Sequence, residues 1–333
     1  MGRSFLSDNF DGLFSKVVKH IYQTPDYVCK PRGQEIKEMI APTLILTNPR
    51  ARILANPIRD AQYGFGVGEF FWYWLGKQDL ESMLYYNKRM GNFSDDGFTL
   101  NSAYGYRTRH QKFDVHYNRD CGHGVFDNTT QWEAAKKTLI DDPDSRRAIL
   151  IIGNAKDYTV GAYQPSKDLP CTLSLQFFIR DNKLHLHTTM RSNDAFWGLT
   201  YDLFSFTLLQ ECMMLELNAA GMKLELGVYS HTAGSLHIYD RHFAQASAIT
   251  DNYVLGGSVI AEPMLPISLE ELASLADQET ALRTRKVAEI GETQFSSGVR
   301  WMAERLNEHR RKRDAERERP VGPSDSNRAQ VVG

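Results

Sequence analysis

The sequence predicts a fold of mixed α/β (α+β) class, because it combines buried-strand patterns with the pattern of a buried helix. Residues 148–153 (AILIIG) form a short apolar run that is typical of a buried strand. Two further strands are expected at 173–179 and 184–190, and Asp181-Asn182 between them suits a tight hairpin. Tyr201–Leu217 is apolar on almost every side, which indicates a helix buried in the middle of the domain.

Three other segments complete the expected organisation. Gln131–Ile140 places its apolar residues on one face, as a surface helix does, and Ser268–Glu271 has the form of a capping box that opens a helix. Glu304–Arg319 carries many charges of both signs, which is typical of a solvated helix. We therefore predict one continuous main domain at 1–255, a helical extension at 256–319 and a disordered tail at 320–333.

Composition excludes several classes of protein. The chain has 333 residues, 42% of them apolar, with 39 Lys and Arg against 41 Asp and Glu. A net charge of −2 gives no overall field for holding nucleic acid or an anionic membrane, so an anionic ligand needs a local cationic cluster. Four widely spaced cysteines and the lack of a signal-peptide pattern predict a reduced, cytoplasmic protein without a membrane span.

Two weak motifs are set aside. The glycines of the Gly64–Gly68 run fail the dinucleotide-binding fingerprint, because Glu69 stands where the third glycine belongs. His116, Cys121 and His123 are a conceivable zinc cluster, but no further ligand pair completes it, so we predict no metal.

The informative stretch runs from Asp168 to Tyr239. Asp168–Thr172 sets a cysteine immediately before a strand, and Arg191–Asp194 ends the hairpin with a cation, a hydroxyl, an amide and a carboxylate. Gly198–Asp202 opens the buried helix with an acid, and Ser235–Tyr239 brings hydroxyl and imidazole groups to a strand end. Each segment alone fits a structural role, as a buried small residue, a polar turn or a helix cap. Their combination favours an active site.

These segments resemble the thymidylate synthase family, which transfers one carbon from methylenetetrahydrofolate to C5 of a pyrimidine nucleotide. The resemblance covers roughly residues 30–243 and rests on P-C-x-L-x-x-Q-F, R-S-x-D-x-x-x-G-x-x-x-D and H-x-x-G-S-x-H-I-Y, with Arg32-Gly33, Gly68–Gly76, Tyr104-Gly105 and Asp142–Arg147 upstream. It implies a large mixed sheet flanked by helices and a homodimer formed through the sheet.

The resemblance also implies residue roles. Cys171 matches the nucleophile that adds to C6 of the base, Glu69 the carboxylate that organises water around it, and Tyr104 the tyrosine of C5 deprotonation. The residues that match the family's nucleotide contacts are Arg32, Arg191, Ser192, His237 and Tyr239. Arg146 and Arg147 match the arginine pair that reaches into the partner subunit's site. Asp194, Gly198 and Tyr201 match the folate-contacting strip. Arg191 is also expected to lower the pKa of the Cys171 thiol.

Asp202 departs from the thymidylate-forming branch, which has asparagine there. A carboxylate accepts from the N4 amino group of cytosine, so this residue resembles the cytidylate-specific members. Thr172 and Met190 replace His and Gln of the methylating branch. Residues 95–103 lack the tryptophan that excludes water there, which predicts a 5-hydroxymethyl product from dCMP or CMP. The alternatives are a deoxyuridylate-directed thymidylate synthase or hydroxymethylase, a CMP enzyme of nucleoside antibiotic synthesis, and a non-catalytic repressor on the same scaffold.

Overall fold

A computed structural model describes residues 2–110, 129–159, 163–164, 166–256 and 259–318. Its centre is an eight-stranded sheet in the order β1-β4-β8-β7-β6-β5, with β3 also on β8 and β2 on β3. β1 with β4 and β7 with β8 are parallel, and the other pairs are antiparallel. The strands are β1 (Ser4–Ser7), β2 (Tyr27–Cys29), β3 (Ile36–Ile40), β4 (Thr43–Leu46), β5 (Ile149–Ile151), β6 (Thr172–Arg180), β7 (Lys183–Asp194) and β8 (Glu225–Tyr239).

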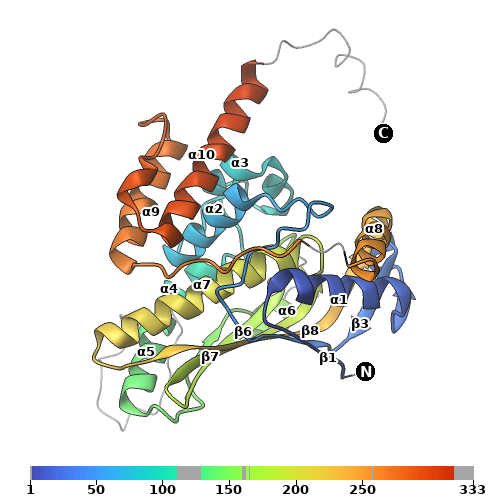
Figure 1. The fold of residues 1–333 in the computed structure, drawn as a ribbon, viewed down its shortest axis with the longest axis horizontal. Coiled ribbons are helices and arrows are strands. Elements are labelled where there is room, and N and C mark those ends of the chain that lie inside the picture. Colours follow the sequence, from blue (N-terminus) through green and yellow to red (C-terminus); the bar gives the residue numbers. More distant parts are fainter. Residues whose placement is uncertain (1, 111–128, 160–162, 165, 257–258, 319–333) are drawn as a thin grey trace.

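The helices lie mainly on one side of this sheet (Figure 1). Figure 1 shows α1 and α7 next to the strands, with α2, α3, α9 and α10 stacked beyond α7. The helices are α1 (Phe10–Gln23), α2 (Tyr63–Trp74), α3 (Leu80–Tyr86), α4 (Tyr104–Arg109), α5 (Gln131–Asp141), α6 (Ala155–Thr159), α7 (Gly198–Ala219), α8 (Phe243–Val254), α9 (Leu269–Arg283) and α10 (Ser297–Glu318). In the described ranges, no helix combines the length and apolarity that a membrane span needs.

The predicted hairpin and the predicted buried helix are both confirmed. Asp181 and Asn182 have φ values of 50° and 56°, the left-handed conformation that a two-residue hairpin with a type I′ turn requires at both positions. α7 is buried along most of its length, as its apolar sequence predicts. It covers the face of the sheet to which Leu184, Leu186 and Thr188 point.

The other face of β7 carries polar side chains. His185, His187 and Thr189 are only half-buried, and His187 Nδ1 lies 2.8 Å from Ser230 Oγ on β8. Burial lowers the pKa of both histidines, so their imidazoles are neutral at physiological pH. This face of β7 is therefore polar and uncharged at the two histidines.

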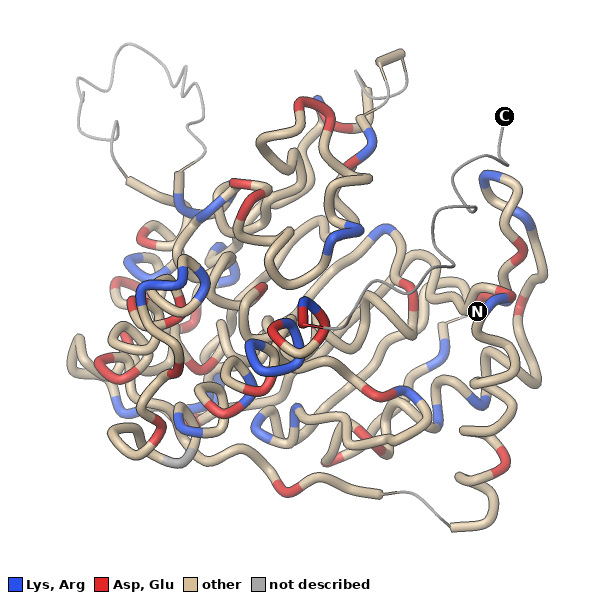
Figure 2. Tube along the Cα trace, turned by 90° about the horizontal axis from the view of Figure 1, so that it is seen from above, with Lys and Arg blue, Asp and Glu red and all other residues tan. Residues whose placement is uncertain are grey.

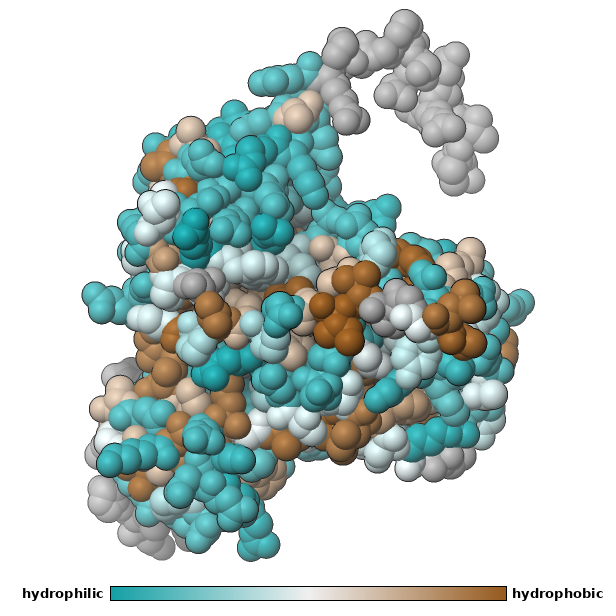
Figure 3. Space-filling model, viewed as in Figure 1, coloured by the Kyte–Doolittle hydropathy of each residue, from teal (hydrophilic) through white to brown (hydrophobic). Residues whose placement is uncertain are grey.

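The C-terminal extension differs from its prediction. α10 begins at Ser297, seven residues before the predicted start, and its first half is apolar on the side that packs against α2. The residues of that stripe are Val299, Met302, Ala303 and Leu306, all buried. Tyr86 of α3 donates a 2.7 Å hydrogen bond to Glu279 of α9. The extension is therefore docked against α2 and α3, while its outer surface is hydrophilic (Figure 3). Residues 319–333, the predicted tail, lie outside the described residues.

Candidate active site

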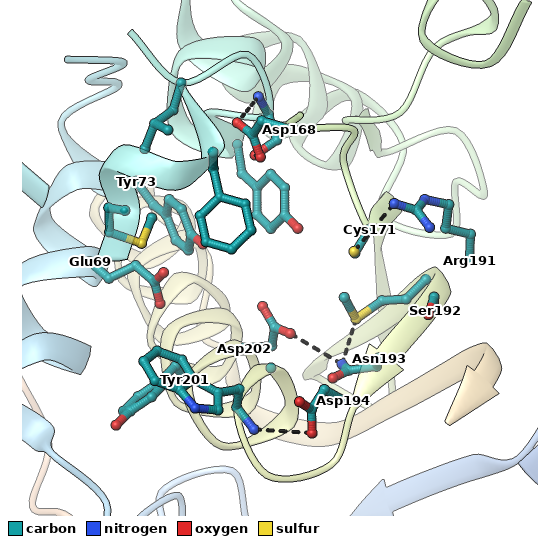
Figure 4. A pocket seen from close by; sticks show the side chains of 18 of the residues that line it. Glu69, Tyr73, Asp168, Cys171, Arg191, Ser192, Asn193, Asp194, Tyr201 and Asp202 are labelled. Atoms are coloured by element: carbon teal, nitrogen blue, oxygen red, sulfur yellow. Dashed lines mark hydrogen bonds between the residues drawn. The ribbon is translucent and has the colours of Figure 1, made fainter. Parts of the chain in front are cut away.

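A cavity of about 320 Å³ opens where the end of β7, the end of β8 and the start of α7 meet α2 and α4. Figure 4 shows Cys171 and Arg191 on one side of it, Glu69 and Tyr73 on the opposite side, and Asp202 between them. Twelve predicted site residues line the cavity: Arg32, Glu69, Tyr104, Cys171, Arg191, Ser192, Asp194, Gly198, Tyr201, Asp202, His237 and Tyr239. The fold thus gathers residues from seven separate segments into one site.

Cys171 lies just before β6, where the backbone N–H of Arg191 donates to its carbonyl and ties it to β7. Arg191 Nη2 lies 3.6 Å from Cys171 Sγ, while its Nε donates to Pro170 O at 2.9 Å. The expected electrostatic effect of Arg191 on the thiol is present, but it is not the largest one. Burial raises the pKa of Cys171 above its ordinary value despite the lowering by Arg191. The expected lowering by Arg191 is therefore present, but the effect of burial on the pKa of the thiol is larger.

Two carboxyl groups inside the cavity have raised pKa values. Burial raises the pKa of Asp202 to about 7, against an opposing hydrogen bond from Asn193. Burial together with the charge of Asp202 raises the pKa of Glu69 to about 8, and a hydrogen bond from Tyr73 acts against the shift. Burial thus moves the pKa values of both groups towards neutral pH, the range in which general acids and bases work.

Tyr104 begins α4 and stacks on Tyr73, with ring centroids 5.2 Å apart. Its hydroxyl accepts a long 3.4 Å hydrogen bond from the backbone N–H of Thr172, the residue after the candidate nucleophile. Burial raises the pKa of Tyr104 well above its ordinary value, and negative charge on Cys171 or Asp202 raises it further. The tyrosine is therefore a neutral hydroxyl held next to the thiol, with a hydrogen to donate to a ligand or a water molecule.

The predicted nucleotide contacts that line the cavity are two aromatic side chains on β8, Ser192 on β7 and two exposed arginines. His237 and Tyr239 are neighbours on the same face of β8, with ring centroids 5.0 Å apart. Arg32 and Arg191 are exposed side chains at the rim, and Arg32 has a φ of 53° in the turn after β2. Arg146 and Arg147 are also exposed, but they do not line the cavity. In the single chain they are thus separate from the site, and their assigned role depends on a second subunit.

Asp194 also has a structural role. Its Oδ1 accepts the backbone N–H of Phe196 at 2.8 Å, which shapes the turn between β7 and α7. Its Oδ2 lies 3.5 Å from the guanidinium of Arg241, which covers the ring of Tyr239. The side chain therefore fixes the entry to α7 while lining the cavity next to Gly198 and Tyr201.

Sequence reasoning missed Asn193 and several apolar residues of the site. Asn193 is buried, and it lines the cavity beside Asp202. The apolar lining comes from Phe65, Trp72, Met90, Phe93, Leu100 and Trp197. Residues 95–103 contain no tryptophan, but Trp72 and Trp197 line the cavity from α2 and from the turn before α7. The apolar runs around Phe70 and Trp197 were the signal available for these residues.

The described residues contain no group of three or more potential metal ligands. The alternative zinc cluster of His116, Cys121 and His123 falls on 111–128, outside the described residues.

Comparison with known proteins agrees with this site. A sequence profile of the thymidylate synthase family matches residues 14–272, so the chain belongs to the thymidylate synthase family. It is 33% identical over 228 residues to a deoxyuridylate hydroxymethyltransferase of Bacillus phage SP01. The aligned region makes up 68% of this chain and 56% of that protein. It is 30% identical over 210 residues to a deoxyuridylate hydroxymethyltransferase of Pseudomonas phage M6. That aligned region makes up 63% of this chain and 54% of the relative.

The chain thus spans just over half the length of these two relatives. The predicted family and the predicted mixed α/β fold with a large sheet are confirmed. The family is one of folate-dependent one-carbon transferases, which agrees with the enzyme class expected from the sequence. Both relatives are named for deoxyuridylate, so the cytidylate branch of the prediction has no support from them.

Proposed function

We propose that this chain is a cytidylate 5-hydroxymethyltransferase, which adds a hydroxymethyl group to C5 of dCMP or CMP from 5,10-methylenetetrahydrofolate and water. The observation that carries the proposal is Asp202, a carboxyl group 7% exposed on the wall of a cavity that also holds Cys171 and Glu69. A buried carboxylate accepts hydrogen bonds and therefore matches the N4 amino group of cytosine. The O4 of uracil would instead face a second acceptor.

The residues of the cavity fit the proposed steps. The Cys171 thiolate adds to C6 of the base, which makes C5 nucleophilic towards the methylene carbon of the folate. A proton shared between Asp202 and N3 of cytosine withdraws electrons from the ring and favours this addition. Loss of the C5 proton, assisted by Tyr104 and the water held by Glu69, eliminates tetrahydrofolate and leaves an exocyclic methylene group. Water then adds to that methylene, and Cys171 leaves.

Deprotonation of Cys171 is opposed by burial, which holds the pKa of the thiol above its ordinary value. The neighbouring guanidinium groups act in the opposite direction, because the positive charges of Arg191 and Arg32 both lower the pKa of the thiol. These two arginines therefore favour the thiolate that adds to C6.

The proposed assembly is a homodimer in which Arg146 and Arg147 complete the neighbour's phosphate site. Both side chains are exposed and adjacent to β5, at one end of the sheet order. The half-buried polar face of β7 and β8 supports a contact between sheets, because hydrogen-bonded histidine and serine side chains need little dehydration of charge. Each composite site would then take Cys171 from one subunit and Arg147 from the other.

Steady-state kinetics with dCMP, CMP, dUMP and UMP test the proposal. We expect the highest kcat/KM with a cytidylate, release of tritium from labelled C5, and ¹⁸O from labelled water in the new hydroxyl group. Tetrahydrofolate should be released, without a build-up of dihydrofolate. A preference for uridylate would refute the proposed substrate, a 5-methyl product would refute hydroxymethylation, and an absence of tritium release would favour the non-catalytic scaffold.

A second candidate is a deoxyuridylate hydroxymethyltransferase, and the two phage relatives favour it. A protonated carboxyl group has one donor and one acceptor, so it is able to pair with O4 and N3–H of uracil. The two candidates therefore differ in where the proton of Asp202 is held rather than in the scaffold. The same four-substrate assay separates them.

A further inference from the structure

Asp202 is part of a buried chain of hydrogen bonds that extends away from the cavity. Asn193 Nδ2 lies 3.1 Å from Asp202 Oδ2 and 3.0 Å from His231 Nε2. On the far side, His231 Nδ1 lies 2.9 Å from the hydroxyl of Tyr229. Asn193 lines the cavity, whereas His231 is fully buried behind it on β8. The carboxyl group is thus connected to an imidazole that does not line the cavity.

The chemistry of this chain fixes the direction of its hydrogen bonds. Burial lowers the pKa of His231 to about 3, so its ring is neutral and has one donor nitrogen and one acceptor nitrogen. The amide nitrogen of Asn193 is a donor and faces Nε2 of His231, so Nε2 is the acceptor nitrogen of the ring. Nδ1 is then the donor nitrogen, and it donates to the hydroxyl of Tyr229. The amide nitrogen of Asn193 then faces three acceptors, which are His231 Nε2, Asp202 Oδ2 and Met190 Sδ, and the thioether sulfur is the weakest acceptor of the three.

Packing holds Asn193 in this position. A Cβ atom on Gly198 would lie 2.4 Å from Asn193 Oδ1 and 3.3 Å from Asp202 Oδ2, so the glycine at the start of α7 leaves room for both groups. Met190 Sδ lies 2.8 Å from Asn193 Nδ2 on a third side. The amide is therefore confined next to Asp202 by β7, β8 and α7.

We propose that Asn193, oriented by His231, is a specificity-determining residue that keeps Asp202 Oδ2 an acceptor and places the donor of the carboxyl group on Oδ1. The inference rests on the proposed function, because it assumes that Asp202 reads the pyrimidine edge. Cytosine and uracil exchange donor and acceptor at N3 and at the exocyclic group. A carboxyl group with a fixed proton position fits one of the two bases, whereas one with a mobile proton fits both.

The test measures the ratio of kcat/KM for dCMP to that for dUMP in variants of this chain. Asn193→Leu removes the amide at similar size, and we expect the ratio to move towards equality by at least tenfold. His231→Phe leaves the cavity lining unchanged and should shift the ratio in the same direction. The double variant should add little to either, because both act on the same hydrogen bond. His231→Gln places an amide oxygen near the position of Nε2 and should restore most of the wild-type ratio.

Asn307→Leu is the matched control, because Asn307 is an equally buried amide that bonds to the backbone of Ile290 in the extension. It should lower the melting temperature and leave the ratio unchanged. An unchanged ratio in both Asn193→Leu and His231→Phe would overturn the inference, as would an equal shift in Asn307→Leu. If Asn193→Leu does not fold, the His231→Phe and His231→Gln pair decides. If the wild-type protein prefers dUMP, the proposed substrate is refuted but this inference is not. The inference concerns how far the Asn193 and His231 variants change the ratio of kcat/KM for dCMP to that for dUMP.

Discussion

Replacing Asp202 with asparagine should transfer substrate preference from cytidylate to uridylate. Asparagine offers an amide donor for O4 of uracil and a carbonyl acceptor for N3–H, whereas the same two groups oppose N4 and N3 of cytosine. Asp202 is 7% exposed at the start of α7, so little water is available to repair a mismatched hydrogen bond. Asn193 Nδ2 would still donate to the amide oxygen of the new residue, which fixes the direction of the amide.

The size of the effect follows from two mismatched hydrogen bonds. A buried polar group without a partner costs about 1–3 kcal/mol, so two mismatches amount to about 2–6 kcal/mol. At about 1.4 kcal/mol for each tenfold change, the selectivity for dCMP over dUMP should change by roughly 30-fold to 20,000-fold. The assay is kcat/KM for both nucleotides, with nucleotide dissociation constants measured in parallel. A variant that binds both nucleotides but keeps the wild-type selectivity would show that another residue reads the base.

Three further outcomes are expected. Cys171→Ala should abolish turnover but retain nucleotide binding by calorimetry, because the phosphate and sugar contacts lie elsewhere; near-normal turnover would contradict the covalent mechanism. Mixing inactive Cys171→Ala with inactive Arg147→Ala should recover some activity, and none despite verified subunit exchange would contradict shared sites. The unfolding free energy should fall between about pH 5 and 7 by up to about 1.4 kcal/mol per pH unit for each of Asp202 and Glu69, because the folded state keeps a proton that the unfolded state loses. Asp202→Asn and Glu69→Gln should each flatten this slope in denaturant titrations, and unchanged slopes would show that neither pKa is raised.

The local patterns of the sequence predict much of the fold because they are short-range. Alternation along 184–190 correctly assigns both faces of β7, and the two turn residues Asp181 and Asn182 correctly place the hairpin. The predicted start of α10 is seven residues too late because the dense run of charges begins only at Glu304. Its apolar positions from Val299 to Leu306 nevertheless have the helical spacing i, i+3, i+4 and i+7, so the signal for docking was present.

The site was predictable where motif residues themselves line the cavity, and it was not where distant residues act together. Asn193 stands inside a recognised motif, but its partner His231 is 38 positions away on β8 and buried behind the cavity. In the register of β7 and β8, His231 pairs with Thr188 and Asn193 with Leu236, so the two side chains meet by reaching along the sheet rather than as direct neighbours. The pKa of Cys171 depends on a balance between burial and Arg191, and burial has no local signature in the sequence. The role of Arg146 and Arg147 depends on an assembly that one chain does not contain.

The distribution of charge in the site explains how a chain of net charge −2 could select a nucleotide. Acidic and basic residues are interspersed over the described part of the chain (Figure 2), so attraction of a phosphate has to be local. Arg32 and Arg191 lie exposed at the cavity rim, where a charged guanidinium keeps its hydration until the phosphate arrives. Inside, burial favours the neutral forms of Asp202, Glu69 and His231, so an uncharged base meets groups that read hydrogen bonds rather than charge. The rim would therefore supply affinity for any nucleoside monophosphate, and the choice of base is left to the buried hydrogen bonds around Asp202.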